Sequence, residues 1–589
     1  MRQYLDAKRQ YRDAIVFFRM GDFYEMFYED AVTASRALDL TLTSRSKDAS
    51  GSRIPMCGLP HHAADGYLAR LVEKGFRVAI CEQVEDPKKA KGVVRREVVR
   101  VVSPGTFTQT AYLDDRAPTF LMGVVLQTQP AASREHDRYG MAVLDLSTGE
   151  FTTAEYDGDT GRQALRDDIA MLRPREVLLS SEDDLRPLLP DAPEPAITTV
   201  EPWTFDVDRA RDALTEQLGT TGLDGFGLDN RPAAVAAAGA VLHYLRDTQK
   251  AQLQHVRSIA FRHTADAMVI DPSTMKHLEV VVSSEGTRKG SLLAELDHTV
   301  TVMGSRLLRA WLLRPLCRLD EVHDRLDAVE ELAFRSVERA KLREVFKSVH
   351  DLERLVARAA MGTAGPRDLL GLQRSLATIP RLRAVLGPLE PPLLKSVCAQ
   401  LDEVPDIRDA IEATLVSEPP ALARDGGAIR DGVDVQLDEL RGISRSGKEQ
   451  IAAMEAAERA RTGVGSLKIR FNRVFGYYIE VSKANLHAVP DDYHRKQTIA
   501  GGERFITPAL KEFERKVLGA DERILEREVR LFDALRDTVG ATAERIQETA
   551  RALARLDVLT GLAETAAVYD YTKPHVHDGD ELLITEGRH

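Results

Sequence analysis

The sequence predicts a multidomain protein of α/β plus α class, in which two mixed α/β domains precede a long-helix domain with an inserted β-rich segment. The length of 589 residues favours about four domains, because one hydrophobic core rarely serves so long a chain. Up to about residue 250, short apolar runs alternate with amphipathic helical patterns. Beyond that point, long patterns rich in Leu, Arg, Glu and Ala dominate, and one strand-rich stretch interrupts them.

The first block, residues 1–108, is predicted to form a compact mixed α/β domain. Its apolar runs have the length of short strands, and its longer patterns have one apolar face. We expect strands at Val16–Phe18, Val78–Cys81 and Val98–Val102 and helices at Tyr24–Leu38 and Ala64–Lys74. The segment Leu113–Pro118, which contains two Asp residues and ends in Pro, marks a break after this block.

The second block, residues 115–250, is predicted to be another α/β domain. We expect its strands at Phe120–Leu126, Met141–Leu146, Phe151–Ala154 and Glu176–Leu179, and a Pro-rich loop at Leu188–Pro195. Asp145 stands at the end of one strand, a common position for a catalytic carboxylate. The sequence offers it no companion carboxylates suited to two-metal chemistry, so we predict a structural role for Asp145.

Residues 251–435 and 513–575 are predicted to form one helical domain that is split in the sequence. The clearest helical patterns are Leu319–Phe334, Ser336–Met361, Phe513–Val539 and Ala541–Tyr569. Between the two halves lies an insert, residues 436–512, with strands expected at Ser466–Asn472 and Tyr477–Val481.

The most informative stretch covers residues 15–30, where an apolar strand runs into a tight turn. Directly after the turn, Phe23 and Glu25 place a large apolar side chain and a carboxylate two residues apart, at the predicted start of a helix. One interpretation is structural. Asp22 and Glu25 have the spacing of a capping box, in which case Phe23 and Phe27 are core residues of that helix.

The same stretch closely resembles the mismatch-binding motif of the MutS family of DNA mismatch repair proteins, with its Phe-x-Glu at Phe23 and Glu25. Other segments resemble the first domain, the lever and the clamp of that family. They are Ile54–Ala63, Val78–Gln83, Arg95–Arg100 with Ser103–Thr106, Thr301–Leu308 and Phe475–Ile479. Several long matches in the same order rarely arise by chance.

The resemblance implies that Phe23 inserts into the base stack beside a mispair and that Glu25 hydrogen-bonds the mispaired base. It also implies names for the blocks. They are a mismatch-recognition domain (1–108), a ribonuclease-H-like connector (115–250), lever helices (251–435 and 513–575) and a clamp (436–512). Members of the family act as homodimers on double-stranded DNA that contains mispairs or small loops, and they recruit MutL.

The family's ATPase, which uses ATP and magnesium, is implied to begin only at residues 576–589. We therefore expect no catalytic residue, metal site or cofactor in the chain as given, and neither binding nor hydrolysis of ATP. Gly442–Glu449 matches Gly-x-x-x-x-Gly-Lys, but Glu449 stands where Ser or Thr binds magnesium. This segment also lies in a helical pattern, Val433–Arg461, with no strand before it.

The net charge of −12 argues against a protein that coats nucleic acid indiscriminately, although it allows local contact with DNA. Basic residues gather in two segments, at positions 88–100 and 461–516. In the second segment, Lys468, Arg470 and Asn472 alternate with apolar residues, which places them on one face of a strand. Lys483, Arg495, Lys496 and Gln497 follow in or beside the next loop.

Contact with the phosphate backbone requires several cationic or amide donors on one surface. The alternative is an ordinary solvated strand face. We take as candidates for backbone contact Arg45, Arg95, Arg96, Lys468, Arg470, Asn472, Lys483, Arg495 and Lys496.

Composition limits the class of protein. A hydrophobic content of 43% and a charged content of 29% are typical of globular proteins, and no apolar run reaches the ~20 residues of a membrane span. The first residues do not resemble a secretory signal. The four cysteines are too few and too scattered for a disulfide framework or a Cys-x-x-Cys metal site. We expect a cytoplasmic protein without a membrane partner, associated with the nucleoid when it is on DNA.

The sequence thus predicts the DNA-engaging part of a mismatch repair sensor. The rival hypothesis is a helical interaction scaffold that derives from the same family and has no preference for mispairs. Binding to mispaired and perfectly paired duplexes distinguishes the two, because only the sensor favours the mispair.

Overall fold

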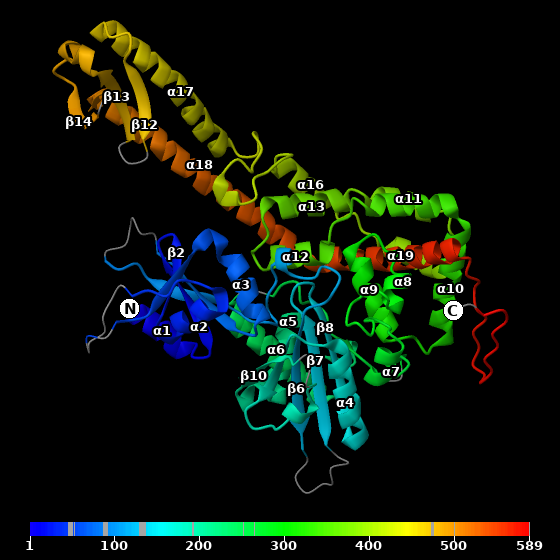
Figure 1. Cartoon of the computed structure of the whole chain (residues 1–589). Helices are drawn as coiled ribbons and strands as arrows, with labels where there is room; N and C mark the ends of the chain where they lie inside the picture. Colours follow the sequence, from blue (N-terminus) through cyan, green and yellow to red (C-terminus); the bar gives the residue numbers. More distant parts are fainter. Residues whose placement is uncertain are drawn as a thin grey trace. The chain divides into compact units, whose positions relative to one another are not determined.

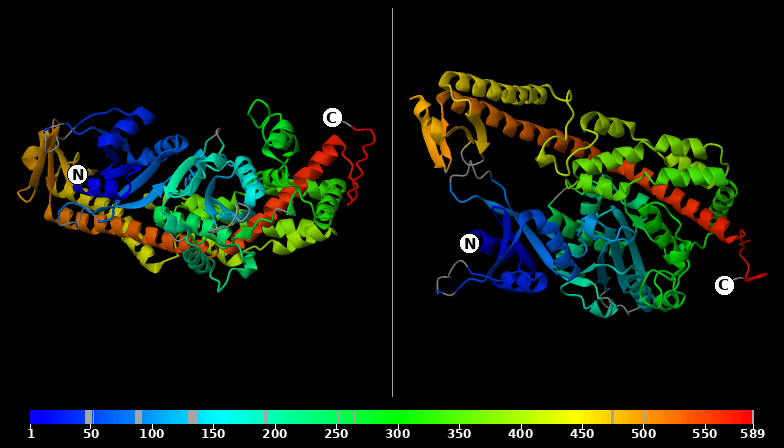
Figure 2. Two further views of the ribbon diagram at one scale, coloured as in Figure 1. Left: turned by 90° about the horizontal axis from the view of Figure 1, so that it is seen from below. Right: turned by 45° about the horizontal axis from the view of Figure 1, so that its top comes forward.

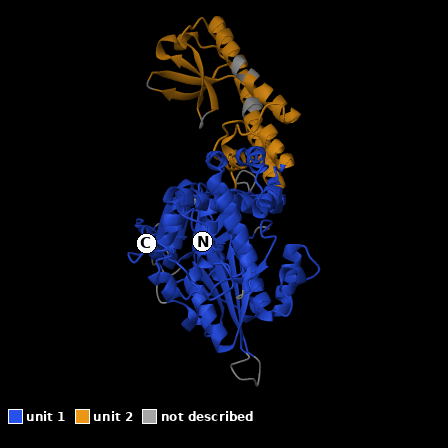
Figure 3. Cartoon of the chain, turned by 90° about the vertical axis from the view of Figure 1, so that its right-hand side faces the viewer, with its two compact units in different colours: residues 1–363, 374–404, 539–589 blue, residues 364–373, 405–538 orange. Residues whose placement is uncertain are grey.

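The computed structural model describes residues 1–587 apart from 45–50, 52, 86–91, 129–136, 191–193, 251–252, 264–265, 473–475 and 500. For Thr110, 446–449 and 515–518 it describes the backbone only. The chain divides into two compact units (Figure 3). Unit 1 comprises residues 1–363, 374–404 and 539–589, and unit 2 comprises residues 364–373 and 405–538.

Unit 1 begins with a five-stranded sheet in the order β3-β2-β1-β4-β5. Its strands are β1 (Ala14–Met20), β2 (Phe23–Phe27), β3 (Met56–Pro60), β4 (Arg77–Gln83) and β5 (Arg96–Val102). The central strand β1 is apolar at five successive positions that are all buried, because helices cover both faces of the sheet (Figure 1). Helices α2 (Tyr28–Leu38) and α3 (Ala64–Glu73) pack on one face, and α1 (Arg2–Gln10) packs on the other.

The helix predicted at Tyr24–Leu38 was wrong in its first turn, which is a strand. Strand β2 pairs with β1 on one side and with β3 on the other, and this pairing buries Tyr24 and Met26. Helix α2 begins only at Tyr28, and its N-cap residue, Phe27, makes no side-chain capping bond. The capping-box interpretation was therefore also wrong.

A buried carboxylate fixes strand β2 and helix α2 against the rest of this sheet. Asp30 accepts hydrogen bonds from the Tyr4 hydroxyl (2.7 Å), the Val16 amide (3.0 Å) and the Lys8 ammonium (2.7 Å). The Tyr4 hydroxyl also lies 2.9 Å from the carbonyl oxygen of Phe27, at the end of β2. Burial, followed by the Asp30 charge, raises the pKa of Tyr4, so this hydroxyl keeps its proton.

A six-stranded sheet follows, in the order β10-β9-β6-β7-β8-β11. Its strands are β6 (Phe120–Gln127), β7 (Arg138–Asp145), β8 (Glu150–Asp157), β9 (Glu176–Ser180), β10 (Ala196–Val200) and β11 (Ala260–Phe261). Helix α4 (Gly158–Leu172) covers one face, and α5 (Val207–Leu218) and α6 (Pro232–Gln249) cover the other. The Ala-rich α6 lies so close to the sheet that a Cβ at Gly140 would meet the Ala233 carbonyl oxygen at 1.9 Å.

Asp145 has the structural surroundings that were predicted for it. It is buried, and its carboxylate accepts hydrogen bonds from the amide (2.9 Å) and hydroxyl (2.6 Å) of Ser147. It also accepts one from the amide of Thr119 at 3.0 Å. These bonds hold the turn between β7 and β8 against the start of β6.

The rest of unit 1 is helical and is built around α19 (Ala543–Tyr569), which is buried along most of its length. Its neighbours include α9 (Val302–Leu313), α10 (Leu319–Phe334), α11 (Ser336–Phe346), α12 (Leu352–Ala360) and α15 (Pro392–Gln400), and α14 (Ile379–Leu386) packs against α11 and α15. The single helix expected at Ser336–Met361 is in fact two, α11 and α12. The second helix has its own N-cap, Asp351, which accepts from the Arg354 amide at 3.3 Å.

Unit 2 contains two long antiparallel helices that lead to a small sheet (Figures 1 and 2). The helices are α17 (Val435–Thr462) and α18 (Pro508–Ala541), joined by an ion pair between Asp434 and Arg527 at 2.7 Å. The sheet has the order β12-β13-β15-β14, with β12 (Lys468–Asn472), β13 (Gly476–Ser482), β14 (His494–Ile499) and β15 (Gly502–Ile506). The smaller helix α16 (Pro405–Thr414) belongs to this unit, and α13 (Pro366–Leu376) crosses its boundary.

Among the helices that the structure describes, none combines the length and the apolar character needed to cross a membrane.

Candidate nucleic-acid interface

Phe23 stands at the tip of the hairpin that β1 and β2 form. A two-residue turn, Gly21-Asp22, places Met20 opposite Phe23. Gly21 has a φ of +60°, and glycine is the residue that adopts this conformation most readily in such turns. The Phe23 side chain is 50% exposed, although most large aromatic residues of this domain are buried.

Strand geometry separates Phe23 and Glu25 from the core. Successive side chains of β2 point to opposite faces, so Tyr24 and Met26 enter the core while Phe23 and Glu25 share the other face. The interpretation of Phe23 as a core residue was therefore wrong. Met20, which is 41% exposed, adds a second apolar side chain beside Phe23. Sequence reasoning missed Met20, although an apolar residue next to a glycine turn was a signal for it.

Glu25 lies on the same face of the sheet, where the neighbouring strands limit the space around its side chain. It pairs with Phe18 of β1 and with Gly58 of β3 across the sheet. A Cβ at Gly58 would lie 3.7 Å from the Glu25 side chain, so a larger residue on β3 would crowd the carboxylate arm. Glu25 is half-buried, which holds its carboxylate two residues behind the exposed Phe23 ring.

Arg96 belongs to the same surface. Its guanidinium lies 5.4 Å from the centre of the Phe18 ring and donates to the carbonyl oxygens of Arg19 (2.6 Å) and Val94 (2.8 Å). Arg95 is exposed and is paired with Glu97, so contact with a phosphate would require it to leave that partner. Arg45 lies outside the described residues.

The core side of the hairpin is held by a second polar group. The Tyr24 hydroxyl donates to Glu82, and the Arg19 guanidinium lies 3.8 Å from the same carboxylate. Burial, together with the hydrogen bond to Glu82, raises the pKa of Tyr24, so the phenol remains neutral. The hairpin therefore presents Phe23 from a rigid base.

The second group of predicted contact residues lies on the sheet of unit 2. On β12, Lys468 and Arg470 are exposed and Ile469 between them is buried, as the alternation predicted. Phe471 departs from the predicted apolar face, because it is 48% exposed, with its ring centre 5.0 Å from that of Tyr477. Asn472 ends the strand and is half-buried.

The remaining candidates lie beyond β13. Lys483 is exposed at the start of a short 3₁₀ helix. Arg495 and Lys496 were expected in or beside a loop, but they lie on β14, where the register shifts between Arg495 and Gln497. Arg495 is exposed and forms an ion pair with Glu503 at 3.3 Å. Both basic strands, β12 and β14, are edges of the sheet.

Edge strands carry Lys and Arg for another reason, since charges there prevent pairing with other chains. The positions of these residues are therefore compatible with both interpretations of the basic insert. Their effect on the salt dependence of DNA binding separates the two, as described in the Discussion.

The segment that matches a phosphate-binding loop in the sequence does not form one. Gly442–Glu449 lies entirely within helix α17. A phosphate loop needs free backbone amides, which a helix interior uses for its own hydrogen bonds. Within the described residues there is also no group of three or more His, Cys, Asp or Glu side chains placed to hold a metal ion.

Comparison with known proteins bears on the whole chain. Residues 1–111 match the family model for MutS domain I, residues 127–257 that for MutS domain II, and residues 273–563 that for MutS domain III.

Curated relatives with the name DNA mismatch repair protein MutS cover almost all of the chain. That of Symbiobacterium thermophilum is 47% identical over 589 residues, which is 99% of this chain and 66% of the relative. That of Pelotomaculum thermopropionicum is 45% identical over 100% of this chain and 68% of the relative. That of Solibacter usitatus is 46% identical over 100% of this chain and 67% of the relative.

The chain therefore spans about two thirds of the length of the curated relatives that it matches. Identity of this level along the entire chain confirms the resemblance inferred from the motifs. The chain belongs to the MutS family of DNA mismatch repair proteins.

Proposed function

We propose that this chain senses mispaired or unpaired bases in double-stranded DNA, with Phe23 as the inserted wedge and Glu25 as the group that meets the mispaired base. The observation that carries the proposal is the half-exposed Phe23 ring at the tip of a rigid hairpin. The buried hydrogen bonds of Asp30 and Tyr24 anchor that hairpin from its core side.

The physical basis of the selectivity is the stiffness of the duplex. An apolar side chain that enters a base step unstacks it and kinks the helix, at a cost of a few kcal/mol. A mispaired step is already weakened, so it accepts the wedge at lower cost than a paired step. The protein thus recognises deformability rather than a base sequence.

We further propose that the six-stranded sheet with α4 to α6 is the family's connector, with a ribonuclease-H-like fold. The four-stranded sheet of unit 2 is then the clamp, and its exposed cations contact the phosphate backbone without regard to sequence. Support comes from the exposure of Lys468, Arg470 and Arg495 on the two edge strands. Arg96 would contact the backbone beside the wedge.

A second copy of the chain and MutL are the further partners that we propose for this chain. We propose ATP with magnesium only for the full-length family protein. In the part of the chain that the structure describes, the Gly442–Glu449 segment is helical, so we do not assign nucleotide binding to it.

The proposed function is tested by titrating the purified chain into two fluorescent duplexes that differ at one base pair. We expect binding to the duplex with the mispair to be tighter by about fivefold or more, as a difference of ~1 kcal/mol in the kinking energy would produce. Equal affinities for the two duplexes would support the rival hypothesis, a helical interaction scaffold without a preference for mispairs.

Glu25→Ala is expected to reduce discrimination rather than affinity. A carboxylate near the DNA polyanion is repelled unless a base donates a hydrogen bond to it, and such a bond contributes ~0.5–1.5 kcal/mol. The ratio of the two affinities should therefore fall by about three- to tenfold. Binding to paired DNA should stay the same or become tighter.

Glu29→Ala is the matched control for this prediction. It removes an exposed carboxylate four residues further along, from the first turn of α2. The control should leave the affinity ratio unchanged. If Glu25→Ala lowers the unfolding temperature and leaves the ratio intact, the carboxylate has only a structural role.

A further inference from the structure

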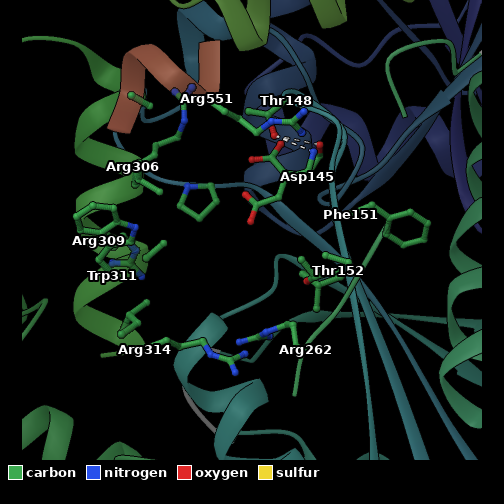
Figure 4. Close-up of a pocket in the computed structure, with 18 of the residues that line it drawn as sticks. Asp145, Thr148, Phe151, Thr152, Arg262, Arg306, Arg309, Trp311, Arg314 and Arg551 are labelled. Carbon is green, nitrogen blue, oxygen red and sulfur yellow. Dashed lines mark hydrogen bonds between the residues drawn. The ribbon is translucent and has the colours of Figure 1, made fainter. Parts of the chain in front are cut away.

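Unit 1 contains a cavity of about 880 Å³ between the six-stranded sheet and the helices around α9 (Figure 4). Its walls come from β7, β8 and α4, from residues 258–263 and 266–267, and from α9, α10 and α19. The volume lies in the range of sites for small organic ligands, ~300–1,000 Å³. Neither Phe23 nor the basic strands of unit 2 belong to its lining.

Arginines from four parts of the chain gather in the lining. They are Arg262, Arg309, Arg314, Arg325, Arg551 and Arg555. Within the described part of the chain, none of the six makes an ion pair. Arg306, on the same helix α9, shows the usual arrangement for comparison. It is paired with Asp351 at 2.7 Å and with Glu353 at 2.6 Å.

Carboxylates also line the cavity, but none of them forms an ion pair with these six side chains in the described part of the chain. Glu353 is paired with Arg306, and Asp145 and Glu150 also belong to the lining. Asp168 accepts a hydrogen bond from the Tyr156 hydroxyl. Asp266, Glu321 and Asp324 complete the acidic lining, and none lies within 4.0 Å of a charged nitrogen of the six arginines in the part of the chain described.

The surroundings disfavour the positive charge of several of these arginines. Burial lowers the pKa of Arg309 and of Arg314, and the neighbours Arg173 and Arg262, respectively, lower it further. Burial also lowers the pKa of Arg325 to about 10. Repulsion between buried like charges is the situation that a bound anion relieves.

The same cavity has a large apolar surface. The Trp311 ring lies on α9 with the Arg325 guanidinium 3.5 Å from its centre, and Phe151 lies on β8 at the other wall (Figure 4). Guanidinium groups bind phosphate oxygens in pairs of parallel hydrogen bonds and also stack on aromatic rings. The lining thus offers partners for a charged group and for an apolar body at once.

We propose that this cavity binds a small phosphate ester with an apolar body, held at its phosphate by Arg262 and Arg314 (Figure 4). Arg262 follows β11 of the sheet, whereas Arg314 lies at the end of α9 and donates a hydrogen bond to the carbonyl oxygen of His263 at 3.2 Å. The bound ester therefore links the six-stranded sheet to the helical part of unit 1 and stabilises their contact. The site is independent of the mismatch-contacting hairpin.

Three probes test the proposal by calorimetry on the whole chain, namely 1-naphthyl phosphate, inorganic pyrophosphate and uncharged 1-naphthol. We expect naphthyl phosphate to bind most tightly, pyrophosphate more weakly and naphthol not measurably. In the double variant Arg262→Gln, Arg314→Gln, binding of naphthyl phosphate should weaken by about tenfold or more, because two charge-assisted contacts are lost.

The control is Arg318→Gln, Arg335→Gln, which removes two exposed arginines that do not line the cavity. This control should bind naphthyl phosphate like the unaltered chain. Equal weakening in both double variants, equal binding of naphthol, or no binding of naphthyl phosphate would each overturn the proposal.

The unfolding temperature without ligand distinguishes a binding role from a structural one. Arg262 and Arg314 form no ion pair in the described part of the chain, and Arg314 donates a hydrogen bond to the carbonyl oxygen of His263, so their double variant should melt close to the unaltered chain. If it melts much lower, the single variant Arg262→Gln takes its place. That variant should weaken naphthyl phosphate binding by about threefold, and unchanged binding would contradict the site.

Discussion

Phe23→Ala should abolish the preference for mispaired DNA while it leaves the fold intact. The wedge supplies the difference between the two duplexes, so without it the ratio of affinities should fall to about one. The ring is 50% exposed, and its loss should change the free energy of unfolding by less than ~1 kcal/mol. Fluorescence anisotropy with the two duplexes and a thermal unfolding curve measure both quantities.

Two further substitutions make this result specific. Phe334→Ala removes a phenylalanine that is 82% exposed on α10, and it should leave the affinity ratio unchanged. Phe17→Ala removes a fully buried ring from β1 and should lower the free energy of unfolding by ~3–5 kcal/mol. If Phe23→Ala behaves like Phe17→Ala and keeps the preference, Phe23 belongs to the core.

Neutralising the basic edges of the unit 2 sheet should weaken binding to every duplex alike. The variant replaces Lys468, Arg470, Arg495 and Lys496 by Gln. Each lost phosphate contact removes about 0.9 from the slope of log affinity against log salt, so the four together remove about 3–4. At physiological salt the affinity should fall by about two orders of magnitude or more, with the mispair preference retained.

A control variant of equal charge change establishes that the effect is local. It replaces four exposed cations of unit 1 by Gln, namely Arg162, Arg186, Lys276 and Lys347. This control should leave the salt slope nearly unchanged. If the unit 2 variant also keeps its salt slope, the four replaced cations do not contact phosphate. Their role is then to keep the strand edges exposed to solvent and to prevent edge pairing.

Much of the fold follows from patterns in the sequence. The apolar runs of four strands, β6 to β9, and the periodicity of α10, α17 and α19 placed these elements to within a few residues, whereas β10 and β11 were not predicted. Two of the errors have a common cause. Phe23–Phe27 and residues 347–351 lie where the pattern fits two structures, and contacts with distant parts of the chain select one of them.

The pairing of β2 illustrates this dependence. Its five residues fit the first turn of a helix as well as a strand, because Phe23 and Phe27 have helical spacing and Tyr24 and Met26 have strand spacing. The strand forms because β2 makes hydrogen bonds with β1, which precedes it in the sequence, and with β3, which follows well after it. That choice moves Phe23 from a core position to an exposed one.

By itself, the sequence determined the family, and it predicted the order of the blocks and the mismatch-contacting pair Phe23 and Glu25, because a motif is local and can be identified without knowledge of the tertiary contacts. Tertiary structure alone decided that Phe23 is exposed and that Arg262, on one domain, faces Arg314, on another. Exposure and charge clustering depend on which distant segments pack together. A local sequence pattern does not contain that information, because the burial of a side chain and the repulsion between charges arise only when the chain has folded.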